Sequence, residues 1–312
     1  MMARDFQDMD RELAAHRVDF PREKVISARA GEVRRRMVSL ASIEPVLANN
    51  YMVKGWIDRN CLSMLYGPSN AGKTFVALDI AMHIASGQPW QGLRVNGGPV
   101  LYIAAEGGAG IRNRLAAIKR DRPEMANAAF TLLPVGLDLH GQGDAMAVCE
   151  IIPDEKPALV VIDTLARSMG AGDENTAKDA AMFVRNCDLI REATGAHVMV
   201  IHHTGKDEDR GARGSSALRA AVDNEIQVTA DWEIISRKQR DQEPPAPLNF
   251  KLRSVTLGLD EDGDPVTSAV VDVAEPPKPA RKPLKGKNEV AMQALYDALR
   301  DHRSQCRRSM TP

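Results

Sequence analysis

Short apolar runs alternate along the chain with longer segments in which apolar residues recur at helical spacing. The runs predict strands at 61–66, 99–104, 129–133, 158–163 and 196–202. The helical spacing predicts helices over 73–86, 108–120, 144–152 and 175–194. Strands that are apolar almost throughout are typical of a parallel sheet that is covered on both faces. The pattern therefore predicts an α/β fold with a mostly parallel sheet flanked by helices.

The pattern changes on both sides of this region. The N-terminal segment is highly charged and predicts an arm or a loose helix, either a solvated surface segment or a contact for nucleic acid. Residues 224–273 predict short antiparallel strands that extend the sheet, with a turn at 261–264. A proline-rich linker and a short amphipathic helix at 287–303 follow. We expect three parts: the arm 1–45, the sheet domain 46–274, and the linker with its helix, 275–312.

A glycine-rich motif stands between the first predicted strand and the first predicted helix. It has the G-x-x-x-x-G-K-[ST] spacing of a phosphate loop, in which backbone N–H groups and the N-terminus of a helix surround phosphate oxygens. Lys73 is expected at the β- and γ-phosphates, and the Thr74 hydroxyl at Mg²⁺. The motif predicts a site for a nucleoside triphosphate, formed by Gly67, Pro68, Ser69, Asn70, Ala71, Gly72, Lys73 and Thr74.

Two carboxylates complete the predicted site. Asp163 ends an apolar strand, as the Mg²⁺-binding aspartate of such sites does, although a strand-end aspartate can also cap a turn. Thr164 follows where some ATPases place their catalytic glutamate, so the general base must come from elsewhere. Glu106 ends another predicted strand and can orient the attacking water, or instead cap the helix that follows it. We predict Glu106 as the base.

Composition and charge restrict the classes of function that the chain can have. The 312 residues have a net charge of −1, so any nucleic-acid surface has to be local or assembled from several subunits. The four cysteines are scattered without a C-x-x-C pair, which disfavours zinc and fits a reducing cytoplasm. The chain has no signal-peptide pattern and no run of about 18 apolar residues that predicts a membrane span.

The order of the motifs resembles that of the RecA/DnaB/KaiC-like ATPases, and most of all the RepA-type hexameric replicative helicases of small plasmids and phages. The lead-in 51–58, the segments Ile201–Lys206 and Arg213–Leu218, and the stretch Arg237–Arg240 carry this resemblance, which covers about 45–257. One stretch departs from the pattern: Glu225–Gln227 stands where the plasmid helicases have an arginine.

The resemblance implies a Mg²⁺-dependent ATPase that forms a homo-hexamer and binds single-stranded DNA. It implies that His203 senses the γ-phosphate, while the neighbouring His202 points to the other face of its strand. Lys238 and Arg240 share a face at strand spacing and are implied to reach the ATP site of the next subunit, although a basic edge strand has the same pattern. The charged segment 204–216 becomes a candidate loop in the central channel, or a plain surface loop.

Two other functions stay open on the sequence. A non-helicase ATPase of the same fold that regulates or loads other proteins has the same phosphate loop and suits the near-neutral charge. A small-molecule kinase also has the loop, but it needs neither Glu106 nor the Lys238–Arg240 segment.

Overall fold

The computed structural model describes residues 27–45, 50–105, 108–152, 156–204, 216–240 and 242–275. The chain divides into two compact units, one ending at Asn49 and one beginning at Asn50. The first contains the helix α2 (Ala28–Arg35) and the 3₁₀ turn η1 (Leu40–Ser42). The Ser27 hydroxyl caps α2 by accepting a hydrogen bond from the backbone of Ala30 at 3.2 Å. The predicted helix at 287–303 lies outside the described residues.

The second unit is built on a nine-stranded sheet with the strand order β11-β10-β9-β8-β3-β7-β6-β4-β5. Its six parallel strands are β3 (Leu62–Gly67), β4 (Val100–Ala104), β5 (Phe130–Leu133), β6 (Leu159–Asp163), β7 (His197–His203) and β8 (Asn224–Val228). The antiparallel extension consists of β9 (Glu233–Gln239), β10 (Leu248–Leu259) and β11 (Pro265–Ala274). A separate small hairpin pairs β1 (Tyr51–Val53) with β2 (Ile57–Asp58). The predicted fold class is confirmed, and each predicted parallel strand lies within one residue of its expected bounds. The prediction is wrong for β8, which pairs parallel with β3 although it lies in the segment expected to be antiparallel.

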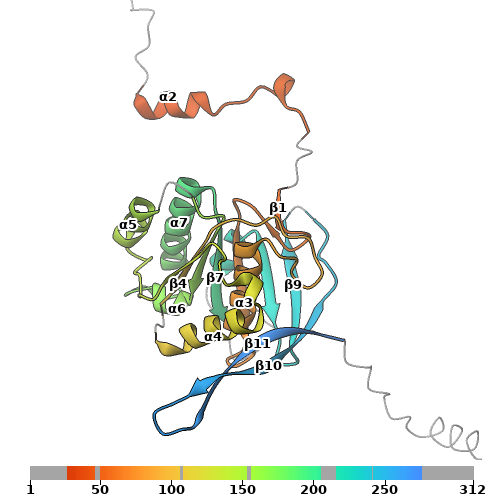
Figure 1. Cartoon of the computed structure of the whole chain (residues 1–312). Coiled ribbons are helices and arrows are strands. Elements are labelled where there is room, and N and C mark those ends of the chain that lie inside the picture. The colour runs from red at the N-terminus through yellow and green to blue at the C-terminus, as the bar shows by residue number, and fades with distance from the viewer. Residues whose placement is uncertain are drawn as a thin grey trace, which may run out of the picture. The chain divides into compact units, whose positions relative to one another are not determined.

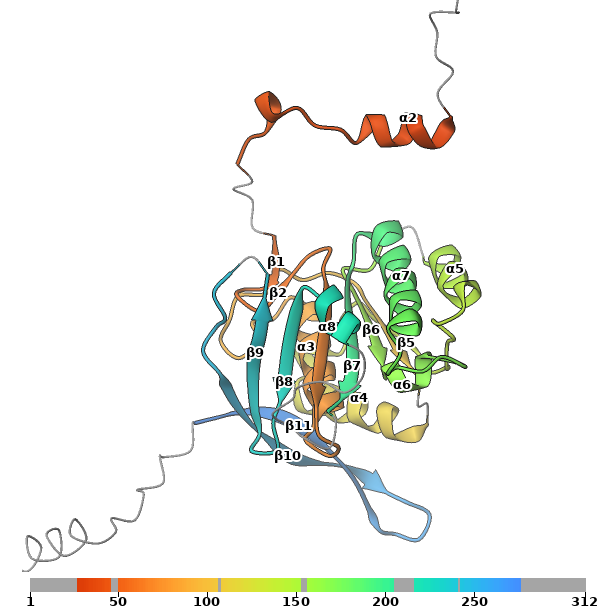
Figure 2. The same ribbon diagram turned by 180° about the vertical axis from the view of Figure 1, so that it is seen from behind.

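Helices cover both faces of the sheet (Figures 1 and 2). One face carries α3 (Lys73–Ser86), α4 (Ala109–Asp121) and the turn η2 (Pro123–Met125). The other carries α5 (Gln142–Ile151), α6 (Leu165–Ser168), α7 (Ala177–Thr194) and α8 (Ser216–Ala221). Helix α7 begins after Thr176, whose hydroxyl accepts a hydrogen bond from the backbone of Asp179 at 3.2 Å.

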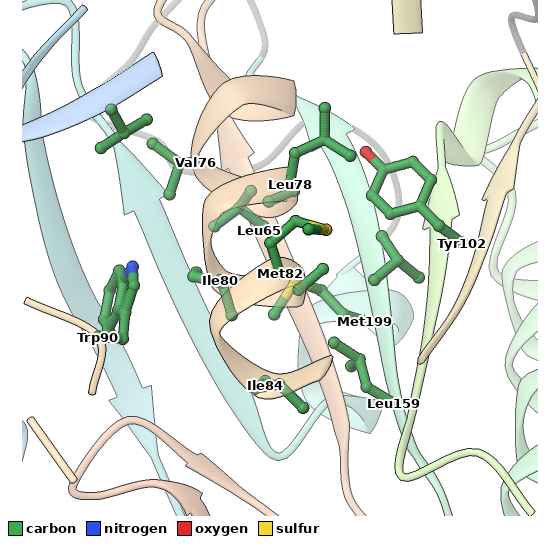
Figure 3. Packing of buried hydrophobic residues seen from close by; sticks show 14 of the residues in the cluster. Leu65, Val76, Leu78, Ile80, Met82, Ile84, Trp90, Tyr102, Leu159 and Met199 are labelled. Carbon is green, nitrogen blue, oxygen red and sulfur yellow. The ribbon is translucent and has the colours of Figure 1, made fainter. Parts of the chain in front are cut away.

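Alternate residues of the central strands enter two different cores. Leu65, on β3, packs with Val76 and Ile80 of α3, as Figure 3 shows. Its neighbour Met64 packs on the opposite face, in the cluster that contains Phe183 of α7. Because both faces of each strand are buried, these strands are apolar throughout, which is the pattern that predicted them.

The β10–β11 hairpin differs from the short strands that the sequence predicts. Its strands have 12 and 10 residues, and Phe250 and Val271 join the core on the α3 face. The outer part projects beyond the sheet as a two-stranded ribbon (Figures 1 and 2). The predicted turn is confirmed: the Asp260 carboxylate accepts hydrogen bonds from the backbone N–H groups of Asp262 and Asp264.

We expect the buried side chain of His197 to make stability depend on pH. Its Nδ1 contacts the Asp58 carbonyl at 2.7 Å and its Nε2 the Ser63 hydroxyl at 2.6 Å, so a neutral imidazole satisfies both. Burial lowers the pKa of His197 to about 4. The unfolded chain, with a pKa near 6.5, takes up the proton first, so stability present above about pH 6.5 falls as pH drops toward 4, by about 3 kcal/mol in all.

Urea unfolding between pH 7.5 and 5 measures this loss before most carboxylates titrate. In His197→Gln the fall over this range should be much smaller, whatever the stability of the variant at pH 7.5. An equally steep fall in the variant would assign the pH dependence to other groups.

Candidate functional site

The phosphate loop connects β3 to α3 at the C-terminal edge of the parallel strands. Gly72 has a φ of +90°, which favours glycine, and it starts α3. At Gly67 a Cβ atom would lie 2.0 Å from the Val228 carbonyl oxygen of β8, so the close approach of that strand requires glycine. The Lys73 ammonium is buried and donates to the carbonyls of Gly67 at 3.0 Å and Pro68 at 2.7 Å. The local sequence thus forms the loop with its lysine folded against it.

A cavity of about 330 Å³ opens over this loop. It brings together loop residues, the start of α3, the end of β7 and side chains from α4 and β10. Its lining is formed by Ser69, Asn70, Gly72, Lys73, Thr74, Phe75, Arg114, Thr164, His203 and Leu252. Five of the eight predicted loop residues and the predicted sensor His203 therefore border one cavity.

Asp163 ends β6, and its position fits that of a metal-binding carboxylate. The side chain is 5% exposed, and its Oδ2 accepts a hydrogen bond from the Tyr102 hydroxyl at 2.7 Å. The next residue, Thr164, borders the cavity, and its buried hydroxyl has no hydrogen-bond partner in the described structure. Buried hydroxyls without a partner are costly, so this one suits a polar ligand.

The donor set fits Mg²⁺. Thr74 and Asp163 supply a hydroxyl and a carboxylate oxygen, the hard ligands that Mg²⁺ prefers. Across the described ranges no group of three His, Cys, Asp or Glu side chains is placed to hold a metal by itself. Mg²⁺ usually completes its shell with substrate phosphates and water, so two protein ligands suffice for it.

Glu106 itself lies outside the described residues, but the chain leading to it is fixed. The strand β4 ends at Ala104 and pairs with β6, so β6 and β7 separate it from the phosphate-loop strand β3. The backbone N–H of Ala105 donates to the Asp163 carbonyl at 2.7 Å. Residue 105 is therefore anchored beside the strand-end aspartate.

The two histidines at the end of β7 point to opposite faces, as strand alternation predicts. His203 is paired with Gly67 and borders the cavity. His202 is paired with Tyr66 and is 1% exposed. Burial, and to a smaller extent the Glu225 carboxylate, raises the pKa of Tyr66, which keeps this phenol protonated beside His202. Only His203 is therefore placed to meet a bound nucleotide.

Lys238 and Arg240 lie near the N-terminal ends of the parallel strands, opposite to the phosphate loop. Lys238 is paired with Glu225, near the start of β8, whereas the phosphate loop follows the end of the parallel strands. The Lys238 ammonium donates to three backbone carbonyls at the C-terminal end of α8, those of Arg219, Ala220 and Val222. Lys238 thus caps a helix of its own subunit, a role that the sequence does not reveal.

Arg240 forms an ion pair with Asp223, Nη1 to Oδ1 at 2.5 Å, but its side chain is 56% exposed. The backbone of Asp223 donates to the carbonyl of Leu62, the first residue of β3. Five residues of strand, about 16 Å, separate Leu62 from Gly67. Arg240 therefore lies far from the phosphate loop of its own chain.

The segment that departs from the plasmid helicases is held by other charges. Glu225 is buried and accepts hydrogen bonds from Arg219 at 3.2 and 3.3 Å, which raises the pKa of that arginine. The Gln227 amide oxygen accepts from Arg237 at 2.7 Å. Both pairs join β8 to its surroundings within one subunit.

The cavity and the residues around it include side chains that the sequence does not place there. The Arg114 guanidinium lies over the Phe75 ring, 4.5 Å from its centroid, and both side chains border the cavity. Leu252 comes from the β10 strand, 178 residues after Thr74, and no sequence signal indicates it. Tyr102 fits the apolar pattern of its strand. Its contact with Asp163 can be inferred only once β4 and β6 are known to be neighbours.

This strand order, with a phosphate loop after β3 and a buried aspartate at the end of β6, defines a P-loop ATPase with a RecA-like fold. The chain belongs to the AAA domain family, whose model matches residues 32–209.

Solved structures with a similar fold include a recombinase and a KaiC-like protein. The RadB recombinase is 17% identical with a TM-score of 0.46, and the match covers 62% of this chain and 88% of that one. A KaiC-like protein from Pyrococcus horikoshii OT3 is 14% identical with a TM-score of 0.49, covering 71% and 93%. These values describe a distant likeness of fold. No match was found among curated proteins.

A search for membrane-spanning helices gave none: in the part of the chain that the structure describes, no helix is both long and apolar enough.

Proposed function

We propose that this P-loop ATPase is Mg²⁺-dependent and acts as a ring-shaped DNA helicase or translocase in plasmid or phage replication. The observation that carries the proposal is the position of His203. It borders the cavity above the phosphate loop, and its strand β7 leads directly into the charged segment 204–216. A change at the γ-phosphate has a short covalent path to a segment suited to gripping DNA phosphates.

In the proposed reaction each residue acts through its own chemistry. The Lys73 ammonium balances charge on the β- and γ-phosphates, and Glu106 accepts the proton of the attacking water. Thr74 and Asp163 would hold Mg²⁺, which would supply charge neutralisation along the phosphates. The exposed Arg240 completes the site of a neighbouring subunit. The cytoplasm is the expected compartment.

The resemblance of the motifs to the RepA-type helicases supports the ring and the DNA substrate. Lys206, Arg210 and Arg213, the candidate DNA contacts, lie in the segment 205–215, outside the described residues. The alternative is a non-helicase ATPase that regulates or loads other proteins, which the near-neutral net charge of −1 favours.

ATP hydrolysis measured with and without single-stranded DNA, together with native mass spectrometry, separates these functions. We expect DNA to stimulate hydrolysis and ATP to favour hexamers. Hydrolysis that ignores DNA in a protein that forms no hexamer would favour the regulatory ATPase. Phosphate transfer to a small acceptor in place of water would indicate a kinase.

Replacing Glu106 with glutamine should separate binding from hydrolysis. The amide keeps the shape of the side chain but cannot accept the proton, so turnover should fall at least about a hundredfold while Mg-ATP binding persists. Glu124→Gln, at an exposed glutamate of η2, is the matched control. If Asp163→Asn spared metal-dependent binding while Glu106→Gln abolished it, the two carboxylates would have exchanged roles.

A further inference from the structure

A buried hydrogen bond connects two neighbouring strands beneath the cavity. The Tyr102 hydroxyl of β4 donates to Oδ2 of Asp163 on β6 at 2.7 Å. In the pairing of these strands Tyr102 is opposite Val161 and Ala104 is opposite Asp163. The two side chains are therefore diagonal neighbours, two residues apart on the same face of the sheet, and this is the face that α3 covers.

The tyrosine side of the bond is rigid. Tyr102 is 0% exposed, and its ring stacks on Phe130 of β5 with centroids 5.9 Å apart. Figure 3 shows the ring among the aliphatic side chains beside α3. A phenol fixed by packing on all sides presents its hydroxyl at a single position, so the bond is formed before any ligand arrives.

On the aspartate side, the hydrogen bond fixes the orientation of the carboxylate. An ionised carboxylate only accepts hydrogen bonds, and a bond to a charged group is roughly twice as strong as one between neutral groups. The Tyr102 hydroxyl takes one lone-pair direction of Oδ2 and thereby fixes the rotation of the carboxylate at the end of β6. Metal-binding carboxylates depend on such partners for their orientation.

We propose that Tyr102 is a positioning residue that holds the Asp163 carboxylate in the orientation needed to bind the Mg²⁺ of the Mg-nucleotide complex. The proposal rests on the proposed role of Asp163. It adds a residue from a strand that the phosphate-loop motifs do not include.

Tyr102→Phe tests this by deleting one oxygen from a buried ring. The measured quantity is the Mg²⁺ concentration that half-saturates the binding of a fluorescent ADP analogue, with its metal-free affinity as reference. We expect the half-saturating Mg²⁺ concentration to rise about 10-fold or more, the usual effect of losing such a partner, while metal-free binding stays unchanged. Tyr102→Leu, which removes the hydroxyl together with the ring, should give a rise at least as large.

Tyr66→Phe is the matched control. Tyr66 is a buried tyrosine too, 2% exposed, but it packs in the cluster on the α7 face, the face opposite to that of Tyr102. It should lose a hydroxyl without changing the Mg²⁺ requirement. A general effect of removing buried hydroxyls would appear in both variants.

The outcomes separate this inference from the proposed function. If Tyr102→Phe lowers only the thermal midpoint and leaves the Mg²⁺ requirement unchanged, while Asp163→Asn raises it, Tyr102 is purely structural and the inference is overturned. If Asp163→Asn leaves the requirement unchanged as well, the role proposed for Asp163 fails, and the inference fails with it.

Discussion

Replacing Lys73 with alanine should abolish ATP hydrolysis and weaken nucleotide binding. Lys73 is the buried cation of the phosphate loop, held within 3.0 Å of the carbonyls of Gly67 and Pro68. In the nucleotide complex its charge is expected on the β- and γ-phosphates, where negative charge grows in the transition state. Removing one such preorganised group costs about 10² to 10³ in rate at comparable sites. Turnover should therefore fall at least to that extent.

Steady-state phosphate release and the binding of a fluorescent ATP analogue measure the two effects. Lys119→Ala, at an exposed lysine in the last turn of α4, removes the same charge away from the cavity and should leave both unchanged. Circular dichroism establishes that each variant is folded. Full turnover by folded Lys73→Ala protein would contradict the assignment of the phosphate loop.

The parallel part of the fold is predictable because its signals are local. The strands β3, β6 and β7 are buried on both faces and are therefore apolar almost throughout. The predicted bounds of α3, 73–86, are those observed, since Lys73 directly follows the glycine that starts the helix. The phosphate loop is eight consecutive residues, so its sequence contains its whole geometry.

The β10–β11 hairpin is less predictable because its outer end has no core to face. The alternation of apolar and polar residues that Phe250 and Leu252 begin shifts by one position after Arg253, and the strand ends in exposed residues. Arg253 is held by Asp121 of α4 and Asp272 of β11, contacts that depend on the folded arrangement. The sequence therefore indicates short strands where the structure has a long ribbon.

The residues of the site also divide into those that the sequence predicts and those that only the fold reveals. His203 and Asp163 end strands and are visible as polar residues after apolar runs. Tyr102 reaches Asp163 because β4 and β6 are neighbours, and Leu252 reaches the cavity because β10 crosses the α3 face. No sequence motif predicts either arrangement. Lys238 differs from these residues. Its spacing suggests a side chain that reaches the ATP site of a neighbouring subunit, whereas in the structure its ammonium caps α8. Glu106 stays a prediction from the sequence.

Replacing Arg240 with alanine should lower hydrolysis by about 10³ or more, the usual contribution of an arginine that neutralises transition-state charge on a neighbour's phosphate. Its exposed side chain and its place at the end of the parallel strands opposite the phosphate loop suit the proposed action on another subunit. Arg237→Ala is the control on the same strand, because Arg237 bonds to Gln227 within its own subunit.

The decisive experiment mixes two inactive variants. In a ring formed from Arg240→Ala and Glu106→Gln subunits, some interfaces combine an intact Glu106 from one subunit with an intact Arg240 from its neighbour. These mixtures should recover part of the ATPase activity, in proportion to the share of such interfaces. A mixture that stays inactive although its subunits exchange would argue against a shared site. A fully active monomer would exclude the ring, because a lone subunit cannot bring Arg240 across the length of β3 to its own phosphate loop.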